Sequence, residues 1–280
     1  MNLSVVIITF NEEANIGRTL SSVQPLVAKG KGEVIVVDSG STDHTVEIAK
    51  SFGAMVFIEE WKGYAAQKNS AIDKAGGEWI LSLDADEEVD LELTSALTST
   101  GDQARAKSGS HEWFLTLGNG SEEVRQGQPA GFSIRRKNYF LGEWIKHGGF
   151  WPDPKLRLFR RGKGRFEDRP VHEDVQVQGP TTLLPYGTLL HHSYPTLSDY
   201  IDHMNRYSSL GAEMVVAKGK VRLSFANIVL RPLFTFVYNY FFRLGFLDGR
   251  EGLLLHLYHA VYVSWKYSKG WELSRKKQLE

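Results

Sequence analysis

The sequence predicts an α/β protein in which a parallel-rich sheet, flanked by helices, is followed by a C-terminal helical extension. Two patterns carry this prediction. In the first hundred residues, short apolar runs rich in β-branched residues alternate with segments of helical periodicity, which is typical of a parallel sheet covered on both faces. From about Leu197 the periodicity is helical to the end. A chain of 280 residues is also long enough to bury a substantial core.

Four strands are expected in the first hundred residues, with helices between them. The strands are expected at 3–8, 34–37, 55–58 and 79–83, and the helices around 16–23, 46–49 and 64–75. Gly53 and Gly76 mark the ends of the second and third helices. Because the carboxyl ends of parallel strands meet at one edge of a sheet, the residues that follow these strands are expected to share a site.

The later part of the sequence is less regular. Short strands are expected at 112–117, 131–136 and 155–159, as an antiparallel extension of the sheet. The helical C-terminal region is expected to break at Gly219 and Pro232, and again near 245–252.

Charge is distributed unevenly although 33 basic residues balance 33 acidic ones. Residues 1–200 hold 21 basic and 27 acidic residues, whereas residues 201–280 hold 12 and 6. We therefore expect an anionic partner for the basic and aromatic C-terminal region, but no nucleic acid. The absence of cysteine excludes disulfides and thiolate metal sites, so any metal would need oxygen or imidazole ligands.

The sequence contains neither an evident signal peptide nor an apolar run of the roughly 20 residues that a membrane-spanning helix requires. We expect a cytoplasmic protein that does not cross the membrane. The segment 221–247 alternates aromatic and apolar residues with isolated arginines, a composition typical of helices that lie in a membrane interface. An oligomer interface or a helical subdomain packed on the sheet would use the same residues, so the oligomeric state stays open.

The residues at the strand ends indicate how a phosphorylated ligand could be bound. Neither the Gly-x-Gly-x-x-Gly fingerprint nor a P-loop is present. Asp38, Asp84 and Asp86 instead follow predicted strands, and carboxylates bind a diphosphate only through a cation such as Mg²⁺ or Mn²⁺. A lone Asp-x-Asp is also common as an ordinary acidic turn.

Four motifs together resemble the family 2 glycosyltransferases, which have a nucleotide-diphospho-sugar-binding fold of the GT-A type. They lie at 4–13, 36–43, 66–69 and 83–86, in the order of that family. Features at 172–174, 191–194, 199–207 and 245–249 further resemble the lipopolysaccharide core β-1,4-glucosyltransferases of Gram-negative bacteria, which move glucose from UDP-glucose to the first heptose of the inner core.

The resemblance implies roles for particular residues. The nucleotide-sugar site would contain Thr9, Phe10, Glu12, Asp38, Lys68, Asp84 and Ala85, with Asp38 accepting a hydrogen bond from uracil. Asp86 would bind Mn²⁺ or Mg²⁺, with Asp84 and either His191 or His192 as further candidates; a buried capping histidine is the alternative for this pair. Taken singly, a strand-end turn would explain Thr9 and Phe10, and a solvated helix face would explain Lys68.

The resemblance also implies an inverting reaction, which needs a base on the acceptor side. Glu173 is the expected base and Asp174 the alternative, although an acidic turn beside Arg169 would look the same. Arg157, Arg160 and His172 are candidates for binding the acceptor or the departing diphosphate, and a solvated strand face is the alternative for the two arginines.

The expected organisation has a GT-A catalytic domain at 1–195, with a nucleotide-sugar half at 1–100 and an acceptor half at 101–195, and a basic, aromatic helical region at 196–280. The implied partners are a UDP-sugar donor, an anionic glycolipid acceptor and the cytoplasmic face of the inner membrane. The alternatives are a transferase for another bacterial surface glycan or lipid-linked sugar, and a catalytically silent glycan-binding protein. A processive synthase is disfavoured because Gln-x-x-Arg-Trp is absent.

Overall fold

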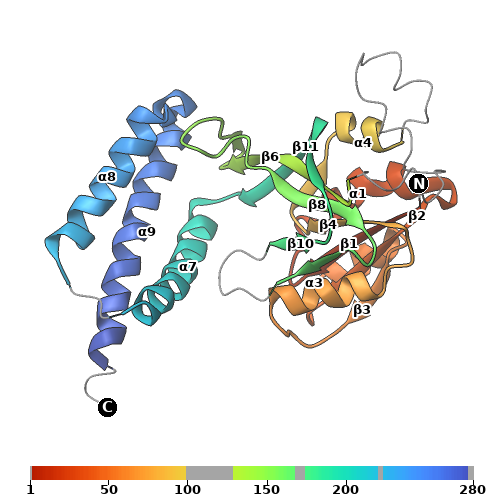
Figure 1. Ribbon diagram of the computed structural model, residues 1–280, viewed down its shortest axis with the longest axis horizontal. Helices are drawn as coiled ribbons and strands as arrows, with labels where there is room; N and C mark the ends of the chain where they lie inside the picture. Colours follow the sequence, from red (N-terminus) through yellow and green to blue (C-terminus); the bar gives the residue numbers. More distant parts are fainter. Residues whose placement is uncertain (1, 99–128, 168–173, 220–222, 277–280) are drawn as a thin grey trace. The chain divides into compact units, whose positions relative to one another are not determined.

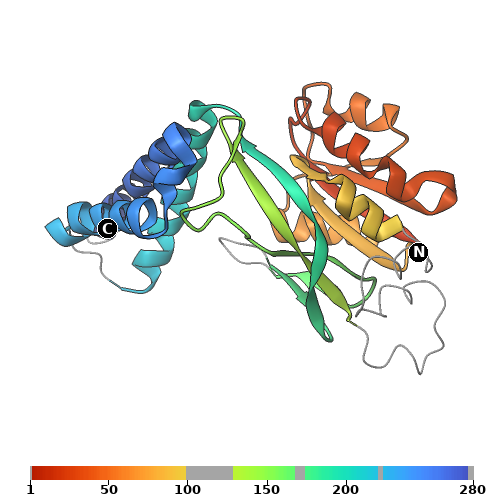
Figure 2. The same cartoon turned by 90° about the horizontal axis from the view of Figure 1, so that it is seen from above.

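The computed structural model describes residues 2–98, 129–167, 174–219 and 223–276, which form two units (Figures 1 and 2). The sheet unit draws on residues 1–136 and 154–191, and the helical unit on 137–153 and 192–280. Residues 137–153 thus pack with the C-terminal helices, although they lie far from them in the sequence. The domain boundary expected at residue 195 stays a prediction.

The parallel part of the sheet is built by the strands expected from the sequence. These are β1 (Leu3–Thr9), β2 (Gly32–Asp38), β3 (Met55–Ile58) and β4 (Trp79–Asp84). The central strand β1 pairs in parallel with β2 and β4, and β2 pairs in parallel with β3. The prediction of four parallel strands joined by helices is confirmed.

An antiparallel extension continues the sheet beyond β4. Its strands are β8 (Lys155–Arg160), β6 (Gly131–Phe140), β11 (Thr181–Tyr194) and β5 (Glu87–Val89). They extend the sheet in the order β4-β8-β6-β11-β5. The antiparallel pairing of β8 with β4 and β6 confirms the strands expected at 131–136 and 155–159. The strand expected at 112–117 lies outside the described residues.

Helices cover both faces of the parallel strands. The sheet unit contains α1 (Ile16–Val27), α2 (Thr45–Ser51), α3 (Tyr64–Asp73) and α4 (Leu91–Thr98), with η1 (Ala28–Gly30) after α1 and a small hairpin of β9 (Gly164–Phe166) and β10 (Val175–Val177). Val5 of β1 packs in one core with Leu20 of α1. The next residue, Val6, packs in a second core with Ala71 of α3, as the alternation of a strand requires.

Besides residues 137–153, the described part of the helical unit contains three α-helices and shorter helical segments. These are α7 (Leu197–Ala217), η3 (Ala226–Leu230), α8 (Arg231–Val237), η4 (Tyr238–Phe242), η5 (Gly245–Asp248) and α9 (Gly249–Lys276); η3 and η4 are π-helical. Both α7 and α8 pack against α9. Thr196 starts α7 with a capping box, in which its hydroxyl accepts a hydrogen bond from the Asp199 N–H and the Asp199 carboxylate binds the Thr196 N–H.

The break expected at Pro232 is wrong, because η3 runs directly into α8 there. Pro232 lies in the first turn of α8, where its missing N–H is tolerated. The break at Gly219 is confirmed, since α7 ends at Ala217 and Gly219 has a φ of 139°. Within the described ranges, no helix combines the length and the apolar character needed to cross a membrane.

Candidate functional site

The carboxyl ends of β1, β2 and β4 meet at one edge of the sheet. The parallel register places Thr9 beside Asp38 and Ile8 beside Asp84. Asp38 and Asp84, which lie 46 residues apart in the sequence, therefore end strands on either side of β1. This shared edge is the feature that the strand pattern predicts, and it is where ligands bind in open α/β sheets.

Asp38 is fully buried and its carboxylate is bound from both sides. One oxygen accepts hydrogen bonds from the Thr9 hydroxyl (2.8 Å) and the Ser41 hydroxyl (2.5 Å). The other accepts from the N–H groups of Gly40 (2.9 Å) and Ser41 (2.8 Å), and the φ of Gly40, 87°, permits this tight turn. Since these bonds occupy the four lone-pair positions of a carboxylate, uracil would have to displace or share one of them. The uracil contact of Asp38 stays a prediction.

The loops after β1 and β2 are held together by side-chain hydrogen bonds. The Asn11 N–H donates to the Ser41 hydroxyl (2.8 Å), and the Glu12 N–H donates to the Thr45 hydroxyl (2.7 Å). Asn11 itself has a φ of 54°, which favours Asn at this position. Phe10 is 56% exposed on the same loop, where its ring is available to a ligand.

Asp84 forms ion pairs with two buried cations. Its Oδ1 lies 2.8 Å from Lys68 Nζ, and its Oδ2 accepts a hydrogen bond from Arg157 Nη2. Although burial raises the pKa of the Asp84 carboxyl, attraction by Arg157 and by Lys68 holds that pKa well below its usual range. The Lys68 ammonium also lies 5.0 Å from the centroid of the Phe166 ring. With 5% and 6% exposure, Lys68 and Arg157 do not form the solvated faces that were the alternatives for them.

Glu87 is the centre of this ion-pair network, and the motif did not single it out. It is completely buried; its Oε1 accepts hydrogen bonds from Arg157 (2.8 Å) and Arg136 (3.0 Å), and its Oε2 accepts from the Asp84 N–H (3.1 Å). The sequence signal for both residues was the alternation of side chains along a strand. Glu87 shares a strand face with the apolar Val89, and Arg136 shares one with the apolar Ile134. Glu87 therefore ties the backbone of the Asp-Ala-Asp turn to two arginines.

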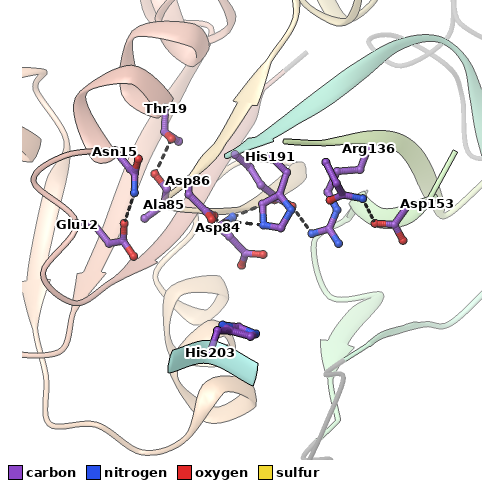
Figure 3. A network of polar contacts seen from close by, with 12 residues as sticks. Glu12, Asn15, Thr19, Asp84, Ala85, Asp86, Arg136, Asp153, His191 and His203 are labelled. Atoms are coloured by element: carbon purple, nitrogen blue, oxygen red, sulfur yellow. Dashed lines mark hydrogen bonds and ion pairs between the residues drawn. The ribbon is translucent and has the colours of Figure 1, made fainter. Parts of the chain in front are cut away.

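The turn itself is anchored on its other side by α1. The carbonyl of buried Ala85 accepts a hydrogen bond from the Thr19 hydroxyl (2.6 Å), a contact drawn in Figure 3. Ala85 thus acts through its backbone, and its small side chain faces the core cluster that contains Leu20. These two hydrogen bonds hold the backbone of the turn directly before Asp86.

His191 lies beside Asp86, and Glu12 lies near the same turn, where its carboxylate accepts a hydrogen bond from Asn15 (Figure 3). His191 Nε2 lies 3.4 Å from Asp86 Oδ2. Burial raises the pKa of Asp86, but the charge and hydrogen bonding of His191 outweigh this and lower it. Burial raises the pKa of Glu12, and repulsion by Asp86, Asp43 and Asp84 raises it further. The carboxylates thus repel Glu12, while His191 offsets part of the charge of Asp86.

The remaining predicted site residues lie elsewhere. Arg160 stands opposite Trp79, at the other end of β4 from Asp84, where it contacts Glu78 (2.7 Å) and stacks on Trp79. His192 belongs to the helical unit and stacks on Tyr139 with ring centroids 4.8 Å apart.

The expected base, Glu173, and His172 lie outside the described residues. Asp174, the alternative base, is exposed just before β10. The choice between Glu173 and Asp174 stays a prediction.

The described residues contain no group of three or more His, Asp or Glu side chains that could hold a metal ion by itself. Asp86 and Glu12 each offer carboxylate oxygens, the donors that Mn²⁺ and Mg²⁺ prefer, and His191 contacts Asp86 rather than adding a hard oxygen ligand. Mg²⁺ in particular is usually bound by one or two carboxylates together with substrate phosphates. The donor set therefore fits a metal whose other ligands come from a diphosphate.

The parallel-rich α/β sheet, with a buried Asp at the end of β2 and an Asp-x-Asp turn that begins at the end of β4, has the arrangement of the GT-A fold. The model of Glycosyl transferase family 2 matches residues 4–162. The lipopolysaccharide core biosynthesis glycosyltransferase LpsC of Rhizobium meliloti is 30% identical over 267 residues, which cover 93% of this chain and 88% of LpsC. The chain therefore belongs to glycosyl transferase family 2.

Two further similarities agree with this assignment. The uncharacterized glycosyltransferase RP128 of Rickettsia prowazekii is 31% identical over 99% of this chain and 89% of its own length. The mannosyltransferase PcManGT of Pyrobaculum calidifontis, solved in complex with GDP-Man and Mn²⁺, is 14% identical. It matches with a TM-score of 0.52 over 96% of this chain and 86% of its own, which shows that the fold is of the GT-A type.

Proposed function

We propose that the chain is a metal-dependent, inverting glycosyltransferase that moves glucose from UDP-glucose to a heptose of the lipopolysaccharide inner core. The observation that carries the proposal is the Asp84-Ala85-Asp86 turn, which is anchored on both sides at the shared edge of β1, β2 and β4. Membership of family 2 supports sugar transfer, and the name of the relative LpsC supports a lipopolysaccharide acceptor.

The donor site of the proposal lies in the loops after β1 and β2. Asp38 would recognise the base by sharing or giving up one of its four hydrogen bonds, with Thr9 beside it and Phe10 and Glu12 lining the pocket. Because the two loops are bonded to each other, this pocket needs little ordering when the donor binds. Lys68 would contribute positive charge near the diphosphate while it holds Asp84.

The carboxylates beside the turn support a divalent cation next to Asp86. Lys68, Arg136 and Arg157 are engaged by Asp84 and Glu87, and His191 contacts Asp86. Repulsion by Asp86 contributes to the raised pKa of Glu12, and a bound cation would relieve it. Asp86 would hold Mn²⁺ or Mg²⁺, with Glu12 and His191 next to it and Asp84 fixing the turn. When bound, the ion would neutralise the charge that develops on the departing diphosphate.

The acceptor step of the proposal requires a carboxylate that takes the proton of the attacking hydroxyl. Glu173 is the proposed base and Asp174 the alternative. His172 and Arg157 are proposed to stabilise the acceptor or the diphosphate, but Arg157 is already engaged by Asp84 and Glu87. Its contribution to substrate binding would therefore act through the position of Asp84. Arg160 is engaged by Glu78 at the far end of β4, which gives no support to a diphosphate contact.

We further propose that the helical unit binds the cytoplasmic surface of the inner membrane peripherally. Around α8, large apolar side chains are exposed: Phe225, Leu230, Leu233, Phe234, Phe241 and Phe242. Arg231 and Arg243 lie among them in the sequence and can meet anionic lipid. An interface between two copies of the chain is the competing explanation.

Sedimentation with phosphatidylglycerol vesicles tests membrane binding against that alternative. The double variant Phe234→Ser/Phe242→Ser should lose sedimentation, because it removes two large exposed apolar surfaces (69% and 74% exposed). The control Ile58→Ser/Leu91→Ser removes exposed apolar side chains of the sheet unit and should sediment like the unmodified protein. A change in oligomeric state with unchanged sedimentation would instead favour the interface.

Transfer itself is tested with a panel of UDP-sugars and core lipids that end in heptose. UDP-glucose with Mn²⁺ should give an acceptor heavier by one hexose, detected by mass spectrometry. The anomeric configuration of the transferred glucose should be opposite to that in UDP-glucose. Transfer only to a different surface glycan or to a lipid-linked acceptor would support a glycosyltransferase but contradict the proposed heptose acceptor. Absence of transfer from every UDP-sugar would reject the donor class.

A further inference from the structure

The hairpin formed by β6 and β7 (Glu143–Trp144) places two lysines opposite each other. Tyr139 pairs with Trp144, and the Ile145 N–H donates to the Asn138 carbonyl (3.0 Å), which continues the pairing by one residue. The next residues outward are Lys137 and Lys146. Since side chains alternate along strands, Lys137, Tyr139, Trp144 and Lys146 lie on the same face.

The two ammonium groups share one aromatic ring. Lys137 Nζ lies 5.1 Å and Lys146 Nζ 4.8 Å from the centroid of the Trp144 ring. Like charges directly opposite each other destabilise a strand pair. Among the described residues neither lysine forms an ion pair with a carboxylate, so the charge is unbalanced within this part of the chain. An anion bound between them would remove the repulsion.

The neighbouring carboxylates do not serve this purpose. Asp248 accepts hydrogen bonds from the backbone N–H groups of Lys146 (3.1 Å) and His147 (2.8 Å), and also contacts the His147 ring. Asp153 accepts from the Asn138 side-chain amide (3.0 Å). Glu143 is adjacent to Trp144 and therefore projects from the opposite face of the hairpin. Asp248 also fixes the backbone at Lys146, so the position of this cation is set in advance.

Aromatic surface lies next to the two cations. The rings of Trp144 and Trp151 meet edge to face, with centroids 5.3 Å apart and planes at 84°. Both side chains are partly exposed. The edge-to-face contact leaves part of the aromatic surface exposed beside the cations, and polar groups beside an aromatic surface are typical of small-ligand sites.

We infer that Lys137, Lys146, Trp144 and Trp151 form a binding site for an anionic saccharide. The phosphoryl or carboxylate group of the sugar lies between the two ammonium groups, and the sugar ring packs on the indoles. This inference rests on the proposed function, in which the acceptor is an anionic glycolipid, and it adds residues that read the charged group of that acceptor. A phosphate and a uronate share the required chemistry, and the experiment separates them.

Binding is measured on the full chain by thermal unfolding and by Trp fluorescence, at constant ionic strength. The probes are glucose 6-phosphate, glucuronate, inorganic phosphate and neutral glucose. The test variant is Lys146→Glu, which replaces the like-charge pair by an opposite-charge pair. It should fold with an unchanged or higher Tm. The control Lys50→Gln/Lys163→Gln makes the same change in net charge at two exposed lysines outside the hairpin.

We expect glucose 6-phosphate, glucuronate or both to raise the Tm of the unmodified protein and of the control, with at least tenfold tighter binding than inorganic phosphate or neutral glucose. Lys146→Glu should lose this shift while it still binds the UDP-sugar donor. The sugar that binds more tightly identifies the anionic group. Equal shifts in Lys146→Glu and the unmodified protein, or no shift with either sugar anion, would overturn the inference.

The proposed function can fail independently of this site. Saccharide binding is measured without donor and without turnover, so a protein that transfers no sugar still reports on the lysines. Conversely, loss of donor binding with intact saccharide binding would reject the donor assignment and leave the hairpin site standing. Trp144→Phe keeps an aromatic ring between the lysines and should retain most of the affinity, whereas Trp144→Ala should lose it.

Discussion

Replacing Arg157 by Met should destabilise the sheet unit far more than the same change at Arg160 on the same strand. Arg157 is 6% exposed and binds both Asp84 and Glu87. Removing one partner of a buried ion pair costs about 3–5 kcal/mol. Because Asp84 keeps Lys68 and Glu87 keeps Arg136, we expect the lower end of that range, about 3 kcal/mol.

Arg160→Met is a matched control, since it removes an arginine from β8 without disturbing the Asp-Ala-Asp turn. Its partner Glu78 has a side chain that is 38% exposed, so the ion pair is worth about 0–1 kcal/mol. Its stacking on Trp79 adds roughly another 0.5–1 kcal/mol, part of which the Met side chain replaces. The free energies of unfolding of both variants are obtained from urea titrations monitored by circular dichroism.

The difference in the free energy of unfolding between Arg157→Met and the unmodified protein should also depend on pH. Arg157 lowers the pKa of Asp84 in the folded state, so the stabilisation is present above the unfolded pKa of Asp, about 3.9, and is lost as the pH falls through the lowered folded pKa. Urea titrations at neutral and acidic pH measure this. Two results would refute the assigned network: an equal loss of stability in Arg157→Met and Arg160→Met, or a loss of stability in Arg157→Met that is the same at acidic as at neutral pH.

Three further outcomes are expected. Glu12→Gln should stabilise the metal-free protein at pH 7, since burial and repulsion by neighbouring carboxylates raise the pKa of Glu12 and its charge is unfavourable there; urea titrations measure the gain. That gain should disappear as the pH falls below the unfolded pKa of Glu, about 4.3, and a stability that is lower at pH 7 would contradict the pKa shift. Glu173→Gln should retain donor binding but lose transfer by at least about 100-fold, as expected for a general base, whereas Asp174→Asn should stay active; the reverse result would move the base to Asp174. Glu87→Gln should lower the affinity for UDP-glucose about tenfold through displacement of Asp84, and an unchanged dissociation constant in calorimetry would show that the network has no influence on the donor site.

The parallel strands could be predicted because they are buried on both faces and therefore read as continuous apolar runs. Val5 and Val6 show this directly, since each packs in a different core. The shared position of Asp38 and Asp84 follows from the same topology. The path of β11 could not be predicted, because its 14 residues mix buried and exposed positions and pair with a three-residue strand far away in the sequence.

The charged network could be predicted only in part. Asp84 and Lys68 belong to recognisable motifs, but their direct contact depends on the packing of α3 against the sheet. Glu87 and Arg136 carry no motif, and their pairing depends on tertiary neighbours that lie 49 residues apart. The direct junction of the π-helical η3 with α8 just before Pro232 was likewise not predictable, since local propensity favours a break there.

Calorimetric titration of UDP-glucose, with and without Mn²⁺, tests the central proposal most directly. The unmodified protein should bind UDP-glucose tightly only when Mn²⁺ is present. Asp86→Asn should remain folded and lose the Mn²⁺-dependent part of the affinity, because this substitution removes the charge that would hold the ion beside the diphosphate. Binding that is equally tight without the metal, or an Asp86→Asn variant with undiminished Mn²⁺-dependent binding, would contradict the proposal.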